Sequence, residues 1–475
     1  MAKTRNVAVI LAGGVGNRVG LSIPKQLIKI AGRPIMEHTL AIVDDHPLID
    51  DVIVMMTPGY LDNVREIVRK NDFGKVSQIL EGAASRNDTT QAALAALGDD
   101  DCNVILHDAV RPLLSPRIIS DVIEALEFRQ AVDVAIPSAD TIIEVDDQVD
   151  PNYPVIKDVP PRANLRRGQT PQAFKLSAIR AAYELANADP RFVATDDCTV
   201  VLRYTPDVPV AVVLGDDRNM KVTEPIDIYI ADKLFQLTSA GDGIDRSEQD
   251  YRDALTGKTM AIFGGSYGIG ADIARLAEKY GATVKCFSRS STNTHINKRD
   301  DLIKARDEVL AETGRVDFVV NTAGVLPLGA LSETSDDTIY EATEINYIGP
   351  VLLAQTFYPQ LKESEGALLL FTSSSYTRGR SGYSLYSSAK AATVNLTQAL
   401  ADEWSADKVR VNCINPERTG TPMRTKAFGD EDPASLLDSE TVAHASLDIM
   451  LASKTGHVID VRKDDPLVGH AEGSG

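Results

Sequence analysis

The segment Met260-Ala-Ile-Phe-Gly-Gly-Ser-Tyr-Gly-Ile-Gly270 joins a short apolar run to a glycine-rich turn. Glycines at 264, 268 and 270 give the turn a G-x-x-x-G-x-G spacing. When such a turn opens a helix, unpaired N–H groups and the positive end of the helix dipole can hold a pyrophosphate. The segment therefore predicts the first strand, loop and helix of a nucleotide-binding α/β domain.

A second glycine-rich turn lies near the N-terminus, in Leu11-Ala-Gly-Gly-Val-Gly-Asn-Arg-Val-Gly20. Short apolar runs alternate with helical stretches after each turn, which is typical of buried parallel strands. The predicted strands are residues 7–11, 51–56, 104–107, 133–136 and 210–214, then 260–263, 283–287, 318–320, 367–371, 409–413 and 458–461. Residues 237–250 between the two series are mostly polar and contain glycine. We expect two Rossmann-like α/β domains in series, at 1–238 and 255–475, with a linker at 239–254.

Composition and net charge indicate a globular protein that does not bind nucleic acid. Hydrophobic residues make up 43% and charged residues 25% of the 475 residues. The 49 basic and 68 acidic residues give a net charge of −19, so we expect no nucleic-acid partner. The N-terminal apolar run is shorter than the roughly 18 residues of a membrane span. We expect a cytoplasmic protein with no membrane partner, whose four widely spaced cysteines are reduced and form no zinc site.

The first glycine-rich turn ends in Pro24-Lys25-Gln26. Glycines allow backbone N–H groups to approach a triphosphate closely, and the cations Arg18 and Lys25 would balance its charge. With these motifs, residues 5–236 resemble the cytidylyltransferases that make CDP-alditols, which share a superfamily with the methylerythritol phosphate cytidylyltransferases. The further matching segments are Ser85-Arg-Asn-Asp-Thr-Thr90, His107-Asp-Ala-Val-Arg-Pro112, Gln169-Thr-Pro-Gln172, Thr195-Asp-Asp197 and Asn219-Met-Lys-Val-Thr223.

This resemblance implies a nucleotidyltransferase fold with CTP as substrate and Mg²⁺ as cofactor. It assigns catalysis to the cations Arg18, Lys25 and Lys221. It places Mg²⁺ on Asp108, and the nucleotide on Ala12, Gly13, Gly14, Gly16, Gly82, Asp88 and Thr89. It also implies that Thr141 and Arg162 touch the incoming sugar phosphate. Relatives often have a second metal-binding Asp where this chain has Arg218, so the second protein ligand to Mg²⁺ stays open.

Two structural alternatives remain for this half of the chain. Asp108 could cap the turn that follows its strand instead of holding a metal. Arg162 could belong to a solvated cluster with Arg166 and Arg167 instead of a substrate site.

In the second half, Tyr386 and Lys390 are four residues apart at the start of a predicted helix and therefore share a face. Lys390 is placed to lower the pKa of the phenol and to reach a cofactor ribose. Ser373 follows the predicted strand 367–371, where it could polarise a carbonyl, and Ser374 competes for this role. With Asn321-Thr-Ala-Gly324 and Asn346, these residues resemble the short-chain dehydrogenase/reductases over about residues 256–462.

The resemblance implies a catalytic tetrad of Asn346, Ser373, Tyr386 and Lys390, with Tyr386 protonating the substrate oxygen as hydride arrives. It assigns the cofactor to Gly264, Ser266, Gly268, Ile269, Gly270, Ser288, Arg289, Asn321, Ala323, Gly324, Tyr386, Lys390, Pro416 and Thr421. The chain departs from the usual family pattern at Phe263, Thr322 and Glu417.

Two inferences concern phosphate groups in this half. Arg289 follows the second strand where an NAD-binding acid would stand, so NADPH is the expected cofactor, unless Arg289 is only an exposed loop cation. Arg378 and Arg380 lie between Ser373 and Tyr386, and we expect one of them to bind a substrate phosphate unless both are merely solvated. Arg424 or Lys426 could support that contact.

Together the halves resemble the bifunctional enzymes that reduce D-ribulose 5-phosphate with NADPH to D-ribitol 5-phosphate and then form CDP-ribitol from CTP. The resemblance implies a product used for capsule-like surface polymers, and a homodimer is expected. Two alternatives stay open. The first half could be a methylerythritol phosphate cytidylyltransferase joined to a reductase of another substrate. The second half could be a non-catalytic module for dimerisation or sensing.

Overall fold

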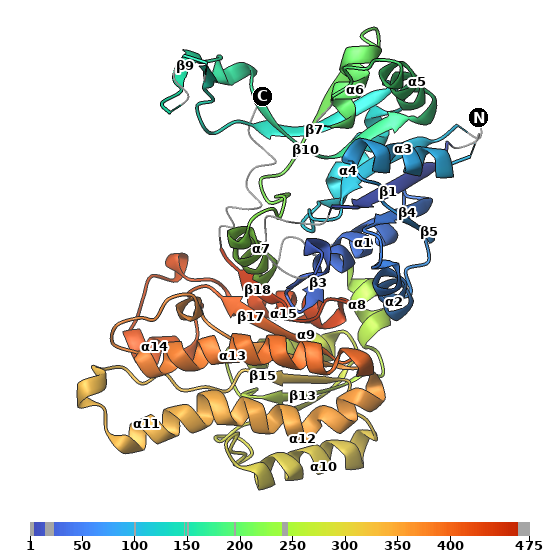
Figure 1. The fold of residues 1–475 in the computed structure, drawn as a ribbon. Coiled ribbons are helices and arrows are strands. Elements are labelled where there is room, and N and C mark those ends of the chain that lie inside the picture. Colours follow the sequence, from blue (N-terminus) through green and yellow to red (C-terminus); the bar gives the residue numbers. More distant parts are fainter. Residues whose placement is uncertain are drawn as a thin grey trace. The chain divides into compact units, whose positions relative to one another are not determined.

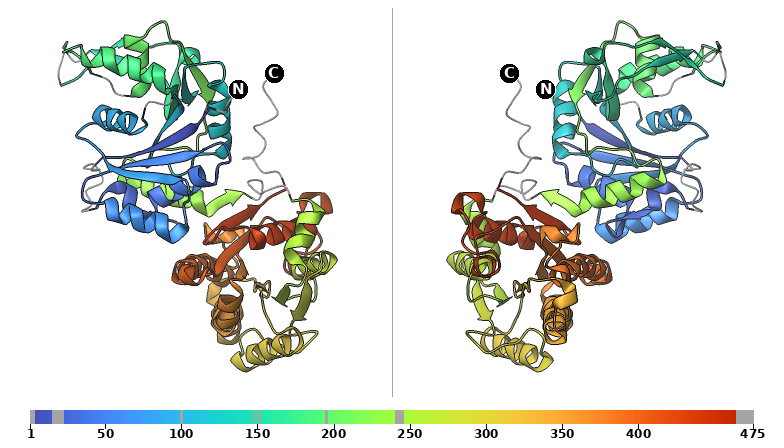
Figure 2. Two further views of the ribbon diagram at one scale, coloured as in Figure 1. Left: turned by 90° about the vertical axis from the view of Figure 1, so that its right-hand side faces the viewer. Right: turned by 90° about the vertical axis from the view of Figure 1, so that its left-hand side faces the viewer.

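A computed structural model describes residues 4–14, 23–98, 101–146, 148–149, 152–193, 196–239 and 246–463. The chain separates into two compact units, Met1–Asp232 and Lys233–Gly475 (Figure 1). Each unit contains a seven-stranded sheet among its described residues, with helices on both faces (Figure 2). The predicted α/β class with two Rossmann-like domains in series is confirmed.

The sheet of the first unit has the order β11-β7-β10-β6-β1-β4-β5. Its strands are β1 (Asn6–Ala12), β4 (Asp51–Met56), β5 (Val76–Glu81), β6 (Asn103–Asp108), β7 (Ala131–Pro137), β10 (Arg166–Lys175) and β11 (Val210–Leu214). β10 runs antiparallel to both β6 and β7, and the other strand pairs are parallel. All seven residues of β1 are buried, because helices cover both faces of this central strand.

Seven helices are described in the first unit. They are α1 (Ile35–Asp45), α2 (Leu61–Asn71), α3 (Arg86–Ala96), α4 (Pro116–Ala125), α5 (Leu176–Asn187), α6 (Asp197–Tyr204) and α7 (Pro225–Gln236), the last of which runs into the second unit. Two small hairpins stand outside the main sheet: β2 (Lys29–Ile30) with β3 (Arg33–Pro34), and β8 (Glu144–Asp146) with β9 (Val155–Asp158). Short 3-10 turns occur at η1 (Lys25–Leu27) and η2 (Arg162–Asn164).

The sheet of the second unit is parallel throughout, with the order β12-β18-β17-β16-β15-β13-β14. Its strands are β12 (Leu237–Ser239), β13 (Thr259–Phe263), β14 (Thr283–Phe287), β15 (Phe318–Asn321), β16 (Ala367–Phe371), β17 (Arg410–Pro416) and β18 (Val458–Val461). Its longer helices are α8 (Glu248–Leu255), α9 (Ile269–Lys279), α10 (Arg299–Thr313), α11 (Asp336–Thr343), α12 (Gly349–Ser364), α13 (Ser384–Glu403), α14 (Pro422–Phe428) and α15 (Ser439–Leu451). α8 lies within the segment predicted as a linker and is stabilised by a capping box of Ser247 and Asp250.

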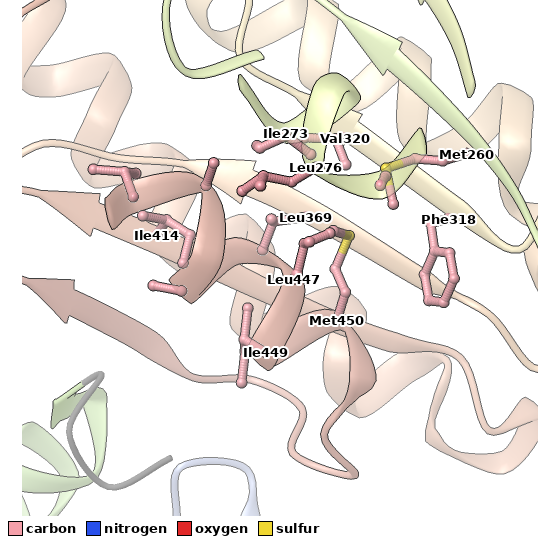
Figure 3. Close-up of a cluster of buried hydrophobic side chains, with 14 of the residues drawn as sticks. Met260, Ile273, Leu276, Phe318, Val320, Leu369, Ile414, Leu447, Ile449 and Met450 are labelled. Atoms are coloured by element: carbon pink, nitrogen blue, oxygen red, sulfur yellow. The ribbon is translucent and has the colours of Figure 1, made fainter. Parts of the chain in front are cut away.

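The core of the second unit has a layer on each side of its sheet. On one side, α9 and α15 pack residues such as Ile273, Leu276 and Leu447 against strand residues such as Val320 and Leu369 (Figure 3). On the other side, buried residues of α10, α12 and α13 cover the sheet, and the ring of Phe263 stacks on Phe287 and meets Phe357 edge-on. This double covering explains why the strands read as continuous apolar runs.

In both units the strand order reverses beside the strand that precedes the glycine-rich turn. In the first unit the reversal lies between β1 and β6, and in the second it lies between β13 and β15. Ligands of open α/β sheets bind at the carboxyl ends of the strands at such a switch point. No described helix is long and apolar enough to cross a membrane.

Candidate active sites

A cavity of about 690 Å³ lies at the carboxyl ends of the strands of the second unit. Its lining includes nearly all residues predicted to bind the cofactor: Gly264, Ser266, Gly268, Ile269, Gly270, Ser288, Arg289, Ala323, Gly324, Tyr386, Lys390, Pro416 and Thr421. Asn321 is not in the lining. It is buried, and its Oδ1 accepts a hydrogen bond from the backbone N–H of Ala323, so it shapes the loop that does line the cavity.

The glycine-rich turn forms a cradle that side chains would fill. Gly264 has φ +89°, and a Cβ atom on it would lie 2.6 Å from the backbone nitrogen of Ala323. Gly268 has φ +63° and caps α9, so the helix N-terminus begins directly after it. Thr322, one of the positions where the sequence departs from the pattern it resembles, donates from Oγ1 to the carbonyls of Phe263 and Gly264 and fixes the turn. This arrangement fits the pyrophosphate of a dinucleotide, at a helix N-terminus that lines the cavity.

A group of hydroxyls stands at one edge of this cavity. Ser266 is hydrogen-bonded to Ser288, and further contacts of 2.8 to 3.3 Å join these hydroxyls to those of Ser290 and Ser291. Arg289 is 68% exposed, with Nη1 3.5 Å from Oε1 of Glu341. The edge thus offers several rotatable O–H donors beside a guanidinium.

The predicted catalytic residues Ser373, Tyr386 and Lys390 line the same cavity. Tyr386 and Lys390 are one turn apart on α13, and Lys390 Nζ lies 5.4 Å from the centre of the Tyr386 ring. Burial raises the pKa of Tyr386 to about 12, while a hydrogen bond with Ser373 opposes that rise. Ser374 also lines the cavity, but it is Ser373 that bonds to the phenol.

The sequence analysis expects Lys390 to lower the pKa of the Tyr386 phenol, but the structure shows Lys390 bonded to another group. Its Nζ donates to the backbone carbonyl of Phe371 over 2.8 Å, and burial lowers the pKa of Lys390 to about 8. The ammonium is therefore directed at the end of β16 rather than at the Tyr386 oxygen. For this reason burial, not Lys390, controls the pKa of the phenol in this structure.

Asn346 lies in η5 (Glu344–Ile348), a π-helical segment between α11 and α12. Such segments frequently mark functional positions. Its side chain is buried and pairs with both backbone groups of Val325, accepting from N–H over 2.9 Å and donating to C=O over 2.8 Å. A Cβ atom on Gly324 would lie 3.1 Å from Asn346 Oδ1 and 4.0 Å from Lys390 Nζ. Asn346 therefore fixes the Gly324–Val325 loop beside Lys390.

The two candidate phosphate-binding arginines behave differently. Arg380 lines the cavity with Ser373 and Tyr386, whereas Arg378 does not, although both residues are exposed. Within the described residues, the Arg380 guanidinium has no hydrogen bond or ion pair with protein. Arg424 also lines the cavity, but Glu431 holds it in a bidentate pair of 2.5 and 2.8 Å.

In the first unit, Asp108 at the end of β6 is the centre of a network of charges. Arg86 Nη1 lies 2.5 Å from Asp108 Oδ1, and Lys221 Nζ lies 2.9 Å from Oδ2. Arg111 approaches Oδ2 at 3.8 Å. Burial alone would raise the pKa of Asp108, but Arg86, Lys221 and Arg111 together hold it well below its ordinary value. The carboxylate is therefore ionised and surrounded by cations that could bind phosphates.

Sequence reasoning assigned no role to Arg86 or to Asp197, its second partner. Arg86 Nη2 lies 3.2 Å from Asp197 Oδ2, and Tyr183 donates its hydroxyl to Asp197 Oδ1 over 2.7 Å. Both residues lie inside segments that carry the family resemblance, Ser85–Thr90 and Thr195–Asp197. The position of Arg86 and Asp197 within these matching segments was the feature of the sequence that could have indicated a role for them.

The predicted nucleotide-binding residues 12–14 and 82–89 meet beside this network. A Cβ atom on Gly82 would lie 2.8 Å from the Cα of Gly13. Thr89 Oγ1 accepts from the backbone N–H of Ala83, and Asp88 bonds to Ser85, which caps α3. The carbonyl of Ala12 accepts from Thr57, and Lys25 opens η1. Gly16 and Arg18 lie outside the described residues, and a Cβ atom on Gly14 would meet nothing within 4 Å.

Thr141 and Arg162 lie on exposed segments beside the β8–β9 hairpin. Arg162 donates to the carbonyl of Ala139 over 3.2 Å. Among the described residues, neither side chain bonds to Asp108 or Lys221.

The fit of Mg²⁺ can be judged from the carboxylates present. In the part of the chain that the structure describes, no group of three or more His, Cys, Asp or Glu side chains could hold a metal ion. Asp216 pairs with Arg218, and the exposed Asp217 pairs with Arg167. Mg²⁺ is commonly bound by one or two carboxylates plus substrate phosphates. Asp108 therefore fits Mg²⁺ as one ligand in a set completed by phosphate oxygens.

Folds and sites together define a class: a cytidylyltransferase-type domain followed by a short-chain dehydrogenase domain. A family model described as 2-C-methyl-D-erythritol 4-phosphate cytidylyltransferase matches residues 6–237, and one described as short chain dehydrogenase matches residues 290–432. Both are families of enzymes.

Whole-length similarity identifies the family. The bifunctional ribulose 5-phosphate reductase/CDP-ribitol pyrophosphorylase Bcs1 of Haemophilus influenzae is 45% identical over 464 residues, covering 97% of this chain and 96% of that protein. The chain belongs to this family of bifunctional enzymes, as the sequence motifs predicted.

Other similarities cover one half of the chain. The 2-C-methyl-D-erythritol 4-phosphate cytidylyltransferase of Thermobifida fusca is 45% identical, covering 49% of this chain and 94% of that protein. A 3-ketoacyl-(acyl-carrier-protein) reductase of Brucella melitensis, solved with NADH, is 26% identical with a TM-score of 0.41, covering 44% of this chain and 97% of that one.

The lowered pKa of Lys390 predicts a pH dependence of stability. The folded protein loses this proton near pH 8 and the unfolded chain near pH 10.5, so stability should rise with pH between these values. Relative to Lys390→Met, the wild-type free energy of unfolding should be flat below pH 8 and should rise by up to about 3 kcal/mol by pH 10.5. Denaturant unfolding followed by fluorescence of Trp404, the single tryptophan, reports on this unit alone.

Lys304→Met, at an exposed position of α10, is the control and should show no such difference. A parallel pH course for wild type and Lys390→Met would contradict the burial argument.

Proposed function

We propose that this chain makes CDP-ribitol in two steps. The second unit reduces D-ribulose 5-phosphate to D-ribitol 5-phosphate with NADPH, and the first unit transfers CMP from CTP to that product and releases pyrophosphate. The observation that carries the proposal is that one chain holds both sites in the order of a 45% identical bifunctional relative. We place the protein in the cytoplasm and treat residues 1–238 and 255–475 as its two functional domains.

In the reductase site, bound NADPH would supply the hydride. Tyr386 keeps its proton at neutral pH because its pKa is about 12, so it can donate that proton to the substrate oxygen as the ketone becomes an alcohol. Ser373 would orient and polarise the same oxygen. Lys390 and Asn346 would hold the ribose and the loop around it, which fits their contacts with Phe371 and Val325.

We infer a preference for NADPH over NADH from the edge of the cavity. Arg289 and the hydroxyls of Ser266, Ser288 and Ser290 would surround the 2′-phosphate of the adenosine ribose. Their donors suit a phosphate, and Glu341 beside Arg289 would lose its partner to the stronger anion.

In the transferase site, a phosphate oxygen of ribitol 5-phosphate would attack the α-phosphorus of CTP, and the bond to the β-phosphate would break. Arg18, Lys25 and Lys221 would neutralise the charge that develops, as in other phosphoryl transfers where positioning and charge dominate. Mg²⁺ on Asp108 would neutralise the triphosphate and the leaving pyrophosphate. Lys221 is already 2.9 Å from Asp108 and 40% exposed, so it can turn to a phosphate.

A coupled assay tests the whole proposal. Ribulose 5-phosphate, NADPH, CTP and Mg²⁺ should give CDP-ribitol, more slowly with NADH in place of NADPH. Tyr386→Phe should reduce the reductase rate by roughly 10²–10⁴-fold and leave CDP-ribitol formation from added ribitol 5-phosphate intact. Product formation is followed by mass spectrometry and NADPH by absorbance.

The alternatives have distinct outcomes in that assay. Preference of the transferase for methylerythritol phosphate over ribitol 5-phosphate would contradict the proposed substrate. No NADPH oxidation with ribulose 5-phosphate would favour a non-catalytic second unit.

Arg380 is proposed to bind the substrate phosphate in the reductase. Arg380→Ala should raise the KM for ribulose 5-phosphate by about tenfold or more, because a charge-assisted hydrogen bond is lost, with little change in the Kd for NADPH. Arg378→Ala is the matched control and should leave the KM unchanged, since Arg378 does not line the cavity. Equal effects of the two variants would refute this assignment.

A homodimer is proposed on the basis of the β8–β9 hairpin, which extends away from the sheet of the first unit (Figure 1). Val145 and Ile156 are paired across it and are 49% and 61% exposed, and Tyr153 is 79% exposed. An isolated two-stranded hairpin is marginally stable, and this one exposes apolar side chains among its charged residues, which a partner surface could cover. A second copy would supply it, beside Thr141 and Arg162.

The Val145→Asp, Ile156→Asp double variant should therefore be monomeric where wild type is dimeric, as measured by light scattering after gel filtration. Charges in an apolar interface without partners oppose association. Leu185→Asp, at a similarly exposed position of α5, should remain dimeric. A dimeric hairpin variant would refute this interface.

A further inference from the structure

Arg86 occupies an unusual position among the cations of the first unit. It is the first residue of α3 and bridges two carboxylates, Asp108 and Asp197, which are 7% and 0% exposed. Its Nε is buried and has no hydrogen-bond partner within the described residues. A guanidinium has five N–H donors, so this side chain retains capacity for another anion.

The surroundings of Arg86 indicate which anion that is. The residue directly follows the turn from Gly82 to Ser85, and Ser85 fixes this turn by capping α3. Gly82 in turn packs against Gly13, beside the glycine-rich turn. Arg86 therefore stands between the two predicted nucleotide-binding turns and the Asp108–Lys221 pair.

The present contacts of Asp108 also require a rearrangement when phosphates bind. Arg86 takes one carboxylate oxygen and Lys221 takes the other. A metal beside these two cations would meet their charge repulsion, so release of one of them would ease its access to the carboxylate. A triphosphate carries more negative charge than one carboxylate and can accept two N–H bonds from a planar guanidinium, whereas Asp108 accepts one, so an arriving triphosphate can take Arg86 from Asp108.

We propose that Arg86 binds the triphosphate of the nucleotide and thereby frees Asp108, while its contact with Asp197 keeps the guanidinium in place. The ligand class is a nucleoside triphosphate, and the inference rests on the proposed cytidylyl-transfer function. Asp197 can serve as this anchor because Tyr183 donates its hydroxyl to the Asp197 carboxylate, and the backbone N–H of Asp197 donates to Gln172.

Binding measurements that separate phosphates from base test this role. Titration calorimetry with the full chain would compare CTP and CMP, each in the presence of Mg²⁺. Arg86→Gln should weaken CTP binding by about tenfold to hundredfold and CMP binding far less. Arg86→Lys should recover part of the CTP affinity, because it keeps the charge but not the bridge to Asp197.

The calorimetry needs a control variant, and three results would contradict the role of Arg86. Arg117→Gln, which removes an exposed Arg–Asp pair on α4, should leave both affinities unchanged. Equal losses for CTP and CMP would indicate a purely structural Arg86 and overturn the inference. Wild-type affinity for CTP in both Arg86 variants would overturn it as well, without affecting the proposed function. If wild type itself binds no CTP, the proposed transferase function fails and the inference fails with it.

Discussion

Burial of the central strands on both faces is the constraint on which the rest of each unit depends. Every residue of β1 and of β13 is buried, and each strand is paired on both sides. Such a strand can present no chemistry along its length. Functional groups can stand only where the strand ends, which is where the glycine turns, Asp108 and Ser373 are found.

Most of the fold could be predicted because parallel strands buried on both faces are plain apolar runs. Three strands of the main sheets are exceptions: β5, β10 and the three-residue β12, which falls in the polar segment between the two series. β10 runs antiparallel through its sheet and contains few apolar residues. Its buried Gln169, Thr170 and Gln172 bond to the carbonyl of Asp216, to His107 and to Asp133. Buried polar residues satisfied by distant partners leave no hydrophobic pattern, so sequence reasoning missed this strand. β5 was missed because it is an edge strand and only half-buried.

The two candidate sites also contain some contacts that the sequence predicts and others that it does not. Tyr386 and Lys390 are four residues apart on one helix, so their proximity follows from helical geometry alone. The pairs made by Arg86 join residues 22 and 111 positions apart, and only the tertiary fold brings them together. The direction of Lys390 toward Phe371, which leaves burial in control of the pKa of Tyr386, also depends on packing that no local pattern contains.

The contact between Gly13 and Gly82 has a consequence for redesign of the transferase. The two backbones approach so closely that a Cβ at either position would press on the opposite turn. Libraries intended to change nucleobase selectivity should therefore leave this pair unaltered. Diversity belongs instead at Ala83, an exposed residue of the same turn, because the Asp88 side chain bonds to Ser85, which caps α3.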